Sequence, residues 1–160
     1  MSEVFPLPDN RGIIRRATRA DVPAIVKLHS EDVLGRTREA YTDPLPELYY
    51  GAFESINADP NQFYAVLEQN GLVIGALQLT FIQGLTYKGA VRAQIEAVQI
   101  AERLRGQRLG EALVRWAVDY ARSKGARMAQ LTSSKSRLDA HRFYERLGFK
   151  RSHEGFKLEL

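Results

Sequence analysis

The clearest hydrophobic pattern in the chain predicts a helix over residues 109–124. Its apolar positions recur every three or four residues, which gathers them on one face of a helix. Glu111 in the first turn and Arg122 and Lys124 in the last complement the helix dipole, and Gly125 is a typical C-terminal cap. The apolar positions are Leu109, Leu113, Trp116, Ala117 and Tyr120.

Shorter patterns predict three further helices. One begins after residues 18–21, with Asp21 as its cap and Pro23 in its first turn. The others are expected over residues 46–57 and 139–147, the last ended by a glycine.

Runs of apolar and β-branched residues predict the strands. We expect them over residues 13–16, 63–68, 72–81, 91–100 and 128–132. The sequence Asn-Gly between the second and third runs is typical of a tight hairpin turn.

The remaining segments complete the expected organisation. Residues 34–43 and 84–89 are predicted loops, and residues 149–150 and 154–160 one or two closing strands. The β-α-β order over residues 91–132 implies a parallel pair, while the hairpins imply antiparallel pairs. We therefore expect a mixed sheet.

The length fits one domain, which we place at residues 12–160 behind a short tail, residues 1–11. No cysteine is present, which excludes disulfide scaffolds, thiol nucleophiles, cysteine-ligated zinc and iron–sulfur clusters. The tail has an early acid and two prolines, so it does not resemble a secretory signal, and no apolar run approaches a membrane span. We expect a cytoplasmic protein.

The composition contains 23 basic and 19 acidic residues, a formal net charge of +4. A solvated surface of mixed sign and an anionic partner both explain this surplus. The position of the basic residues has to distinguish them, and three arginines gather in the segment 101–111, between a strand and a helix. They are Arg103, Arg105 and Arg108.

Two glycines in the same segment favour an anion site. Gly106 and Gly110 let backbone N–H groups converge, and the following helix start adds unpaired donors and a positive dipole end. The spacing matches neither a dinucleotide fingerprint nor a P-loop. The alternative is an exposed arginine-rich turn.

Two motifs resemble the GNAT superfamily of N-acetyltransferases. Residues 105–113 are similar to its acetyl-CoA pyrophosphate loop, Arg/Gln-x-x-Gly/Arg-x-Gly/Ala, with Arg108 where glycine is common. Residues 139–149 are similar to its Ala-x-x-Phe-Tyr-x-x-x-Gly-Phe helix. The resemblance implies an α/β (α+β) fold, in which four helices flank a mixed, mostly antiparallel twisted sheet of six or seven strands. The resemblance also implies a splayed parallel pair of strands at the cofactor cleft.

The resemblance also implies which residues bind acetyl-CoA. Val98 and Ile100, with Gln99 between them, match strand positions whose backbone pairs with the pantetheine arm. Arg137 stands where the family often has asparagine, and we expect it to meet the ribose phosphate. Tyr144 matches the tyrosine that protonates the departing CoA sulfur or donates a hydrogen bond to it. The implied pyrophosphate loop is Arg105, Gly106, Gln107, Arg108, Leu109, Gly110 and Glu111.

Glu96 is the candidate general base for deprotonating the amine. It interrupts an apolar strand, and strict alternation would place it on the same face as Val98. Related strands in the family often use this acid as a base or through a water. The alternative is a structural pair with an arginine. With no enzyme thiol available, the mechanism we favour is direct attack of the amine on the thioester.

The acceptor is less defined. The C-terminal half is similar to aminoalkylphosphonate acetyltransferases over residues 94–96, 139–144 and 152–156, which suggests a small primary amine. Protein lysine or N-terminal acetylation and a non-catalytic acyl-CoA sensor are the alternatives. We expect no metal, nucleic-acid or membrane partner, and leave a homodimer open.

Overall fold

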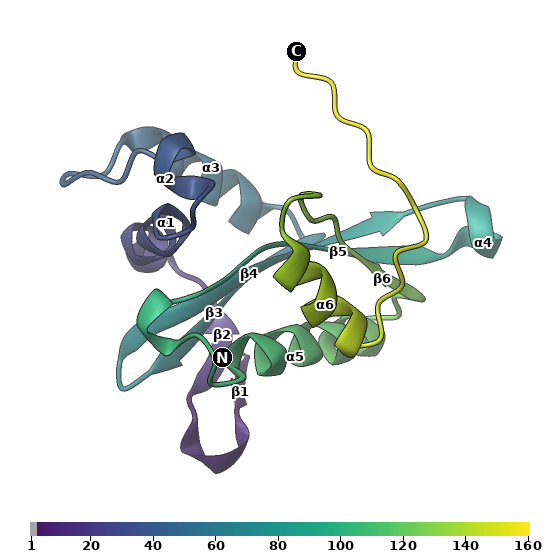
Figure 1. Ribbon diagram of the computed structural model, residues 1–160, viewed down its shortest axis with the longest axis horizontal. Helices are drawn as coiled ribbons and strands as arrows, with labels where there is room; N and C mark the ends of the chain where they lie inside the picture. The colour runs from purple at the N-terminus through teal and green to yellow at the C-terminus, as the bar shows by residue number, and fades with distance from the viewer. Residues whose placement is uncertain (1–2) are drawn as a thin grey trace.

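The computed structural model describes residues 3–160 and shows a six-stranded sheet with helices on both faces (Figure 1). The strands lie side by side in chain order, from β1 to β6. All neighbours are antiparallel except β5 and β6, which are parallel. The strands are β1 Val4–Pro6, β2 Ile13–Arg16, β3 Gln62–Gln69, β4 Leu72–Gln83, β5 Val91–Ile100 and β6 Met128–Gln130.

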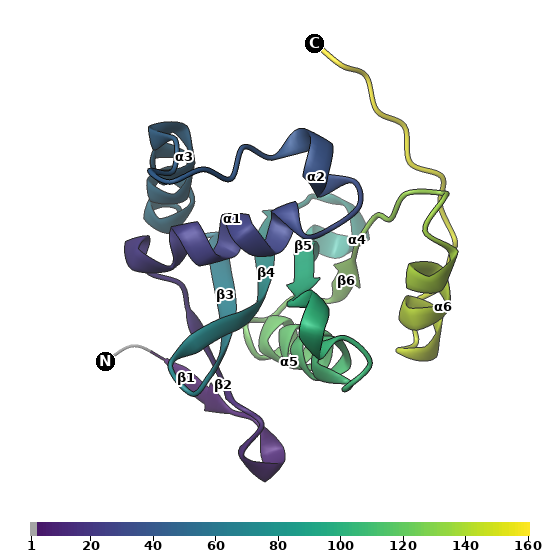
Figure 2. The same cartoon turned by 60° about the vertical axis from the view of Figure 1, so that its left-hand side comes forward.

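Different parts of the chain cover the two faces of the sheet (Figure 2). The first three helices pack on one face over a core that includes Val26, Phe53 and Val66. The last two lie on the other face, over a core that includes Phe63 and Leu113. The helices are α1 Val22–Ser30, α2 Gly35–Arg38, α3 Glu47–Ala58, α4 Thr86–Gly89, α5 Leu109–Ser123 and α6 Leu138–Arg146.

The structure confirms the fold class, with a mixed sheet, mostly antiparallel, and one parallel pair. It also confirms the long amphipathic helix, which is α5. Leu113, Val114 and Ala117 on its inner face are fully buried, and Trp116 and Tyr120 stack near Phe63. Burial of each large apolar side chain contributes about 1.5–3 kcal/mol, so packing of this stripe holds α5 on the sheet.

The N-terminal side differs from the expectation in two respects. Residues 4–6, expected in a tail, form β1, because their backbone pairs with β2 and Phe5 packs against Trp116. Asp21 does not cap α1 through its side chain. It bonds instead to the backbone N–H of Thr18 at 2.7 Å and to Arg15, whose guanidinium also reaches Glu68.

The C-terminal side differs more. The predicted closing strands are wrong, because residues 148–160 form no strand pairing and are exposed apart from Phe149. Strand β6 ends at Gln130 rather than Thr132, because its pairing with β5 covers only three residues. The predicted loops 34–43 and 84–89 each contain one short helix, α2 and α4.

Candidate active site

A β-bulge in β5 determines which side chains face each layer. Ile95 and Ile100 both join the core beneath α5, although strict alternation would put residues five apart on opposite faces. One extra residue resolves this. Gln78 pairs with Glu96 and Ala76 with Gln99, and Ala97 adopts a left-handed φ of 54°.

The bulge corrects one expectation about Glu96. Val98 packs with Ile95 and Ile100 against the α5 core, so Glu96 and Val98 lie on opposite faces of β5. The expectation that they share a face is wrong because β5 is not a regular strand at Ala97. Glu96 is exposed, and no ion pair to it is recorded within residues 3–160, so the alternative of a structural arginine pair is not observed there.

Glu96 ends a polar row across three strands. Tyr64 is opposite Gln78, and Gln78 is opposite Glu96, and directly opposed residues share a face. Tyr64 belongs to the core under α1 and α3, so the row lies on that face. The Tyr64 hydroxyl lies 2.9 Å from Nε2 of His29 on α1.

The histidine and the tyrosine form a neutral pair. Burial lowers the pKa of His29 below its ordinary value, which favours the neutral ring at pH 7. Burial, with the nearby Glu39 charge, raises the pKa of Tyr64. The tyrosine hydroxyl can therefore donate to Nε2. Sequence reasoning did not single out Tyr64; only the cross-strand register connects it with Glu96.

The loop between β5 and α5 exposes a set of free backbone donors. Within residues 3–160, no hydrogen-bond acceptor is recorded for the amides of residues 106–111, and the first helical bond of α5 runs from the Ala112 N–H to the Arg108 carbonyl. Gly106 and Arg108 have left-handed φ values of 83° and 60°. A helix start with unpaired donors binds anions, so the loop fits a phosphate group.

The basic residues around this loop are only partly those expected. Arg105 Nε lies 3.4 Å from the Ile100 carbonyl, and Arg11, which the sequence analysis did not select, donates to the Gln107 carbonyl. Arg137 precedes α6 and forms an ion pair of 3.4 Å with Asp32. Its expected contact with a ribose phosphate stays a prediction.

Three elements meet at Gly110 in the first turn of α5. A Cβ built there would lie 3.6 Å from Ile100 at the end of β5 and 3.7 Å from Phe143 on α6. Beyond Gln94, β5 continues for six residues without pairing to β6, which leaves its edge open at residues 98–100. The open edge, the loop and α6 therefore surround one region, which fits an extended molecule that carries a phosphate.

Tyr144 lies on α6, beside Phe143 and Phe149, with ring centroids 5.0 and 5.8 Å away. Burial raises the pKa of the Tyr144 hydroxyl above its ordinary value, and the positive charge of Arg137 opposes this. The hydroxyl is therefore protonated at neutral pH and can donate a proton or a hydrogen bond. Within residues 3–160, no cluster of three side chains suited to a metal ion is found, and no helix is long and apolar enough to cross a bilayer.

Comparison with known proteins agrees with this geometry. Residues 30–149 match the model of the acetyltransferase (GNAT) family. The chain is 37% identical over 114 residues to the aminoalkylphosphonate N-acetyltransferase of Salmonella typhimurium, covering 69% of this chain and 73% of that one. It is 32% identical over 93 residues to a glucosamine 6-phosphate N-acetyltransferase of Trypanosoma brucei brucei, covering 58% and 61%.

A solved structure is similar over nearly the whole chain. It is described as a transcriptional regulator from Bacillus halodurans and has a TM-score of 0.89 and 46% identity. The match covers 92% of this chain and 98% of that one.

Proposed function

We propose that this chain transfers the acetyl group of acetyl-CoA directly to a primary amine of a small molecule. The chain belongs to the acetyltransferase (GNAT) family and is an N-acetyltransferase. The observation that carries the proposal is the run of unpaired amides at residues 106–111, next to the open edge of β5. A pyrophosphate needs such donors, and an extended amide-containing arm needs a free strand edge.

In the proposed site the cofactor and the general base lie on different faces of β5. The loop amides and Arg105 hold the pyrophosphate, and the backbone of residues 98–100 pairs with the pantetheine arm. The acetyl group then lies beside the bulge at Ala97, where the strand gives access to Glu96 on the other face. In this proposal the bulge at Ala97 places the cofactor on one side of the reacting carbonyl and Glu96 on the other.

The chemical step is an aminolysis of the thioester. Glu96, directly or through a water, removes a proton from the ammonium form of the substrate. The free amine attacks the acetyl carbonyl, so a C–N bond forms and the C–S bond breaks. The sulfur leaves as a thiolate and takes the proton of Tyr144, whose hydroxyl is protonated at neutral pH. The nitrogen, which carries one proton too many after the attack, releases it to solvent, and the Tyr144 phenolate takes a proton back from solvent. Alignment of the two reactants can supply about 7 kcal/mol or more of the barrier reduction.

The acceptor we propose is an amine that also carries an anionic group. The names of the two curated relatives describe a phosphonate and a phosphate on a small amine. On this chain Arg36 and Arg38 lie on α2, each paired with an acidic residue, and an anionic substrate would compete for these two arginines. Protein lysine or N-terminal acetylation is the other candidate class.

The test is release of free CoA thiol, measured with a thiol-reactive dye. The panel contains an aminoalkylphosphonate, an amino sugar phosphate, each amine without its anionic group, and a lysine peptide. We expect release that requires an amine and a lower KM for the anionic members. Preference for the peptide would contradict the small-molecule acceptor, and tight acetyl-CoA binding without turnover on any amine would contradict the proposed reaction.

A further inference from the structure

The face of β5 that carries Glu96 is polar along the strand. The pairing of β5 with β4 is regular from residue 91 to residue 96, so Arg92, Gln94 and Glu96 share this face. Ala93 and Ile95 alternate with them and face the α5 core. A row of three polar side chains therefore leads from Glu96 toward the start of β5.

The neighbouring strands extend this row into an uncovered area of the sheet. Ile82 on β4 and Met128 on β6 lie opposite Arg92, and opposed residues share a face. Within residues 3–160, neither side chain is recorded in the core under α1 and α3 or in the core under α5. Gln130 on β6 lies opposite Gln94, and its side-chain amide donates a hydrogen bond to Gln94 Oε1 at 2.7 Å. The floor of this area thus combines amide groups with two apolar side chains.

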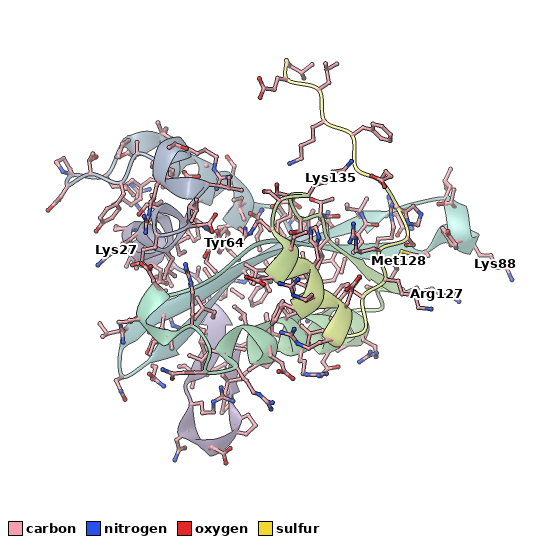
Figure 3. The ribbon with its side chains drawn as sticks, viewed as in Figure 1. Lys27, Tyr64, Lys88, Arg127, Met128 and Lys135 are labelled. Atoms are coloured by element: carbon pink, nitrogen blue, oxygen red, sulfur yellow. The ribbon has the colours of Figure 1, made fainter. Side chains whose placement is uncertain are left out.

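A basic cavity lies at the end of this area that is distant from Glu96. It has a volume of about 330 Å³, and its lining includes Arg92, Lys88 from α4 and Arg127. Figure 3 shows Lys88, Arg127 and Met128 toward the same end of the sheet. Within residues 3–160, no acidic side chain lines the cavity and no ion pair is recorded for its three basic residues. Cations without an acidic partner favour an anion, and a phosphate or phosphonate group can accept hydrogen bonds from several of them at once.

We propose that the acceptor is a long amine that lies along β5, with its amino group at Glu96 and a phosphate or phosphonate group in the basic cavity. The inference deepens the proposed function and rests on it, because Glu96 is there the base that deprotonates the amine. Glu96 and Arg92 are four residues apart on one strand, which separates their Cα atoms by about 13 Å. Between its charged ends the acceptor contacts the amides of Gln94 and Gln130, and the apolar side chains opposite Arg92 pack against its carbon chain.

The arginines of α2 are the competing place for the anionic group. Arg36 and Arg38 already have acidic partners, in ion pairs of 3.9 and 2.7 Å with Glu102 and Glu39, so an anion has to displace a carboxylate there. In the basic cavity no such partner has to leave. A short acceptor does not reach the cavity from Glu96, so the length of the acceptor that binds best decides between the two places.

The first experiment measures this length with a series of ω-aminoalkylphosphonates of increasing chain length. CoA thiol release gives the KM of each member, and the alkylamines of the same lengths correct for the apolar contribution of the chain. We expect the KM of the phosphonates to fall, relative to the plain amines, until the chain is long enough to reach Arg92. A lowest relative KM for the shortest members would overturn the long acceptor and leave the proposed acetyl transfer intact.

The second experiment removes single charges from the basic cavity. Arg92→Gln should raise the KM of the long phosphonate about tenfold and leave its kcat and the KM of the plain amine unchanged. Lys88→Gln should raise the same KM, while its matched control Lys27→Gln should behave like wild type. Both lysines are exposed, and Figure 3 shows them on opposite sides of the molecule. Circular dichroism checks that the variants are folded. A wild-type KM in folded Arg92→Gln and Lys88→Gln would refute the cavity as the anion subsite.

The third experiment does not depend on turnover. The long phosphonate is titrated calorimetrically into the protein saturated with CoA. We expect Kd to rise about tenfold in Arg92→Gln and to rise with salt, because the cations of the cavity are partly exposed. Binding with this dependence but without acetylation of any amine would support the cavity as an anion site and contradict the proposed reaction. Equal Kd values in wild type and Arg92→Gln would overturn the subsite whether or not the amine is acetylated.

Discussion

Replacing Gly106 by alanine tests whether the shape of the loop before α5 determines acetyl-CoA binding. Gly106 has a φ of 83°, and a Cβ built there meets nothing within 4 Å, so the substitution adds conformational strain without a clash. The left-handed region costs an L-residue about 1–2 kcal/mol, and the stiffer unfolded chain offsets about 0.4–1 kcal/mol. The net effect is about 1 kcal/mol.

Gly125 is a matched control for this change. It has a φ of 85°, equally open surroundings, and a position beyond the C-terminal end of α5. Gly125→Ala should therefore lower the free energy of unfolding by the same amount, about 1 kcal/mol, without changing acetyl-CoA binding. In Gly106→Ala the exposed loop can relax instead, and binding must then restore the amide arrangement.

The assay is calorimetric titration of both variants with acetyl-CoA, together with urea denaturation. We expect Kd to rise about fivefold for Gly106→Ala, since 1.4 kcal/mol corresponds to a factor of ten. Gly125→Ala should bind like wild type. Equal Kd values for both variants and wild type would refute the assignment of the loop amides to the cofactor.

Four further predictions concern single residues. Tyr144→Phe should lower kcat at least tenfold with little change in acetyl-CoA Kd, and an unchanged kcat would remove it as the proton donor. Glu96→Gln should shift the pH–rate profile or raise the KM of the amine; if steady-state kinetics show neither, Glu96 is not the base. Gly110→Val should abolish acetyl-CoA binding in a titration, because the valine methyl groups would clash with Ile100 and Phe143. Gly110→Ala should bind normally, because a single Cβ fits between these two side chains. Asp21→Asn should lower the free energy of unfolding by about 2 kcal/mol at pH 7, because Arg15 loses one of its two charged partners and keeps only Glu68. Burial raises the Asp21 pKa but its hydrogen bonds lower it further, so the net pKa is depressed, and urea titrations should show the difference shrinking as the pH falls below about 4.

Local patterns in the sequence were sufficient for most of the fold. The stripe of α5, the turn at Asn70 and the apolar runs of β3 to β5 are each determined by neighbouring residues. The two motifs were enough to identify the loop before α5 and the helix with Tyr144. In the structure Gly110 of that loop lies near Phe143 of that helix, and their role in one cofactor site stays a prediction.

The contacts between side chains in the site could not be predicted from local sequence patterns. The face of Glu96 depends on the extra residue at Ala97, and an alanine with a left-handed φ has no sequence signature. The pairing of Tyr64 with His29 joins residues that are 35 positions apart. The contact between Arg11 and the loop before α5 spans 96 positions. Such contacts depend on how the strands and helices pack, and periodicity carries no information about them.

The C-terminal segment, residues 154–160, shows the same division. The apolar residues Phe156, Leu158 and Leu160 belong to a segment that we predicted as a closing strand, and the structure shows no strand there. The sequence of a segment does not say whether a sheet edge is available to pair with it. Within residues 3–160 no strand pairs with the outer edge of β6, and the C-terminal segment is exposed. Only the packing of the whole sheet and its helices decides which segments meet at an edge, so the sequence of one segment cannot predict it.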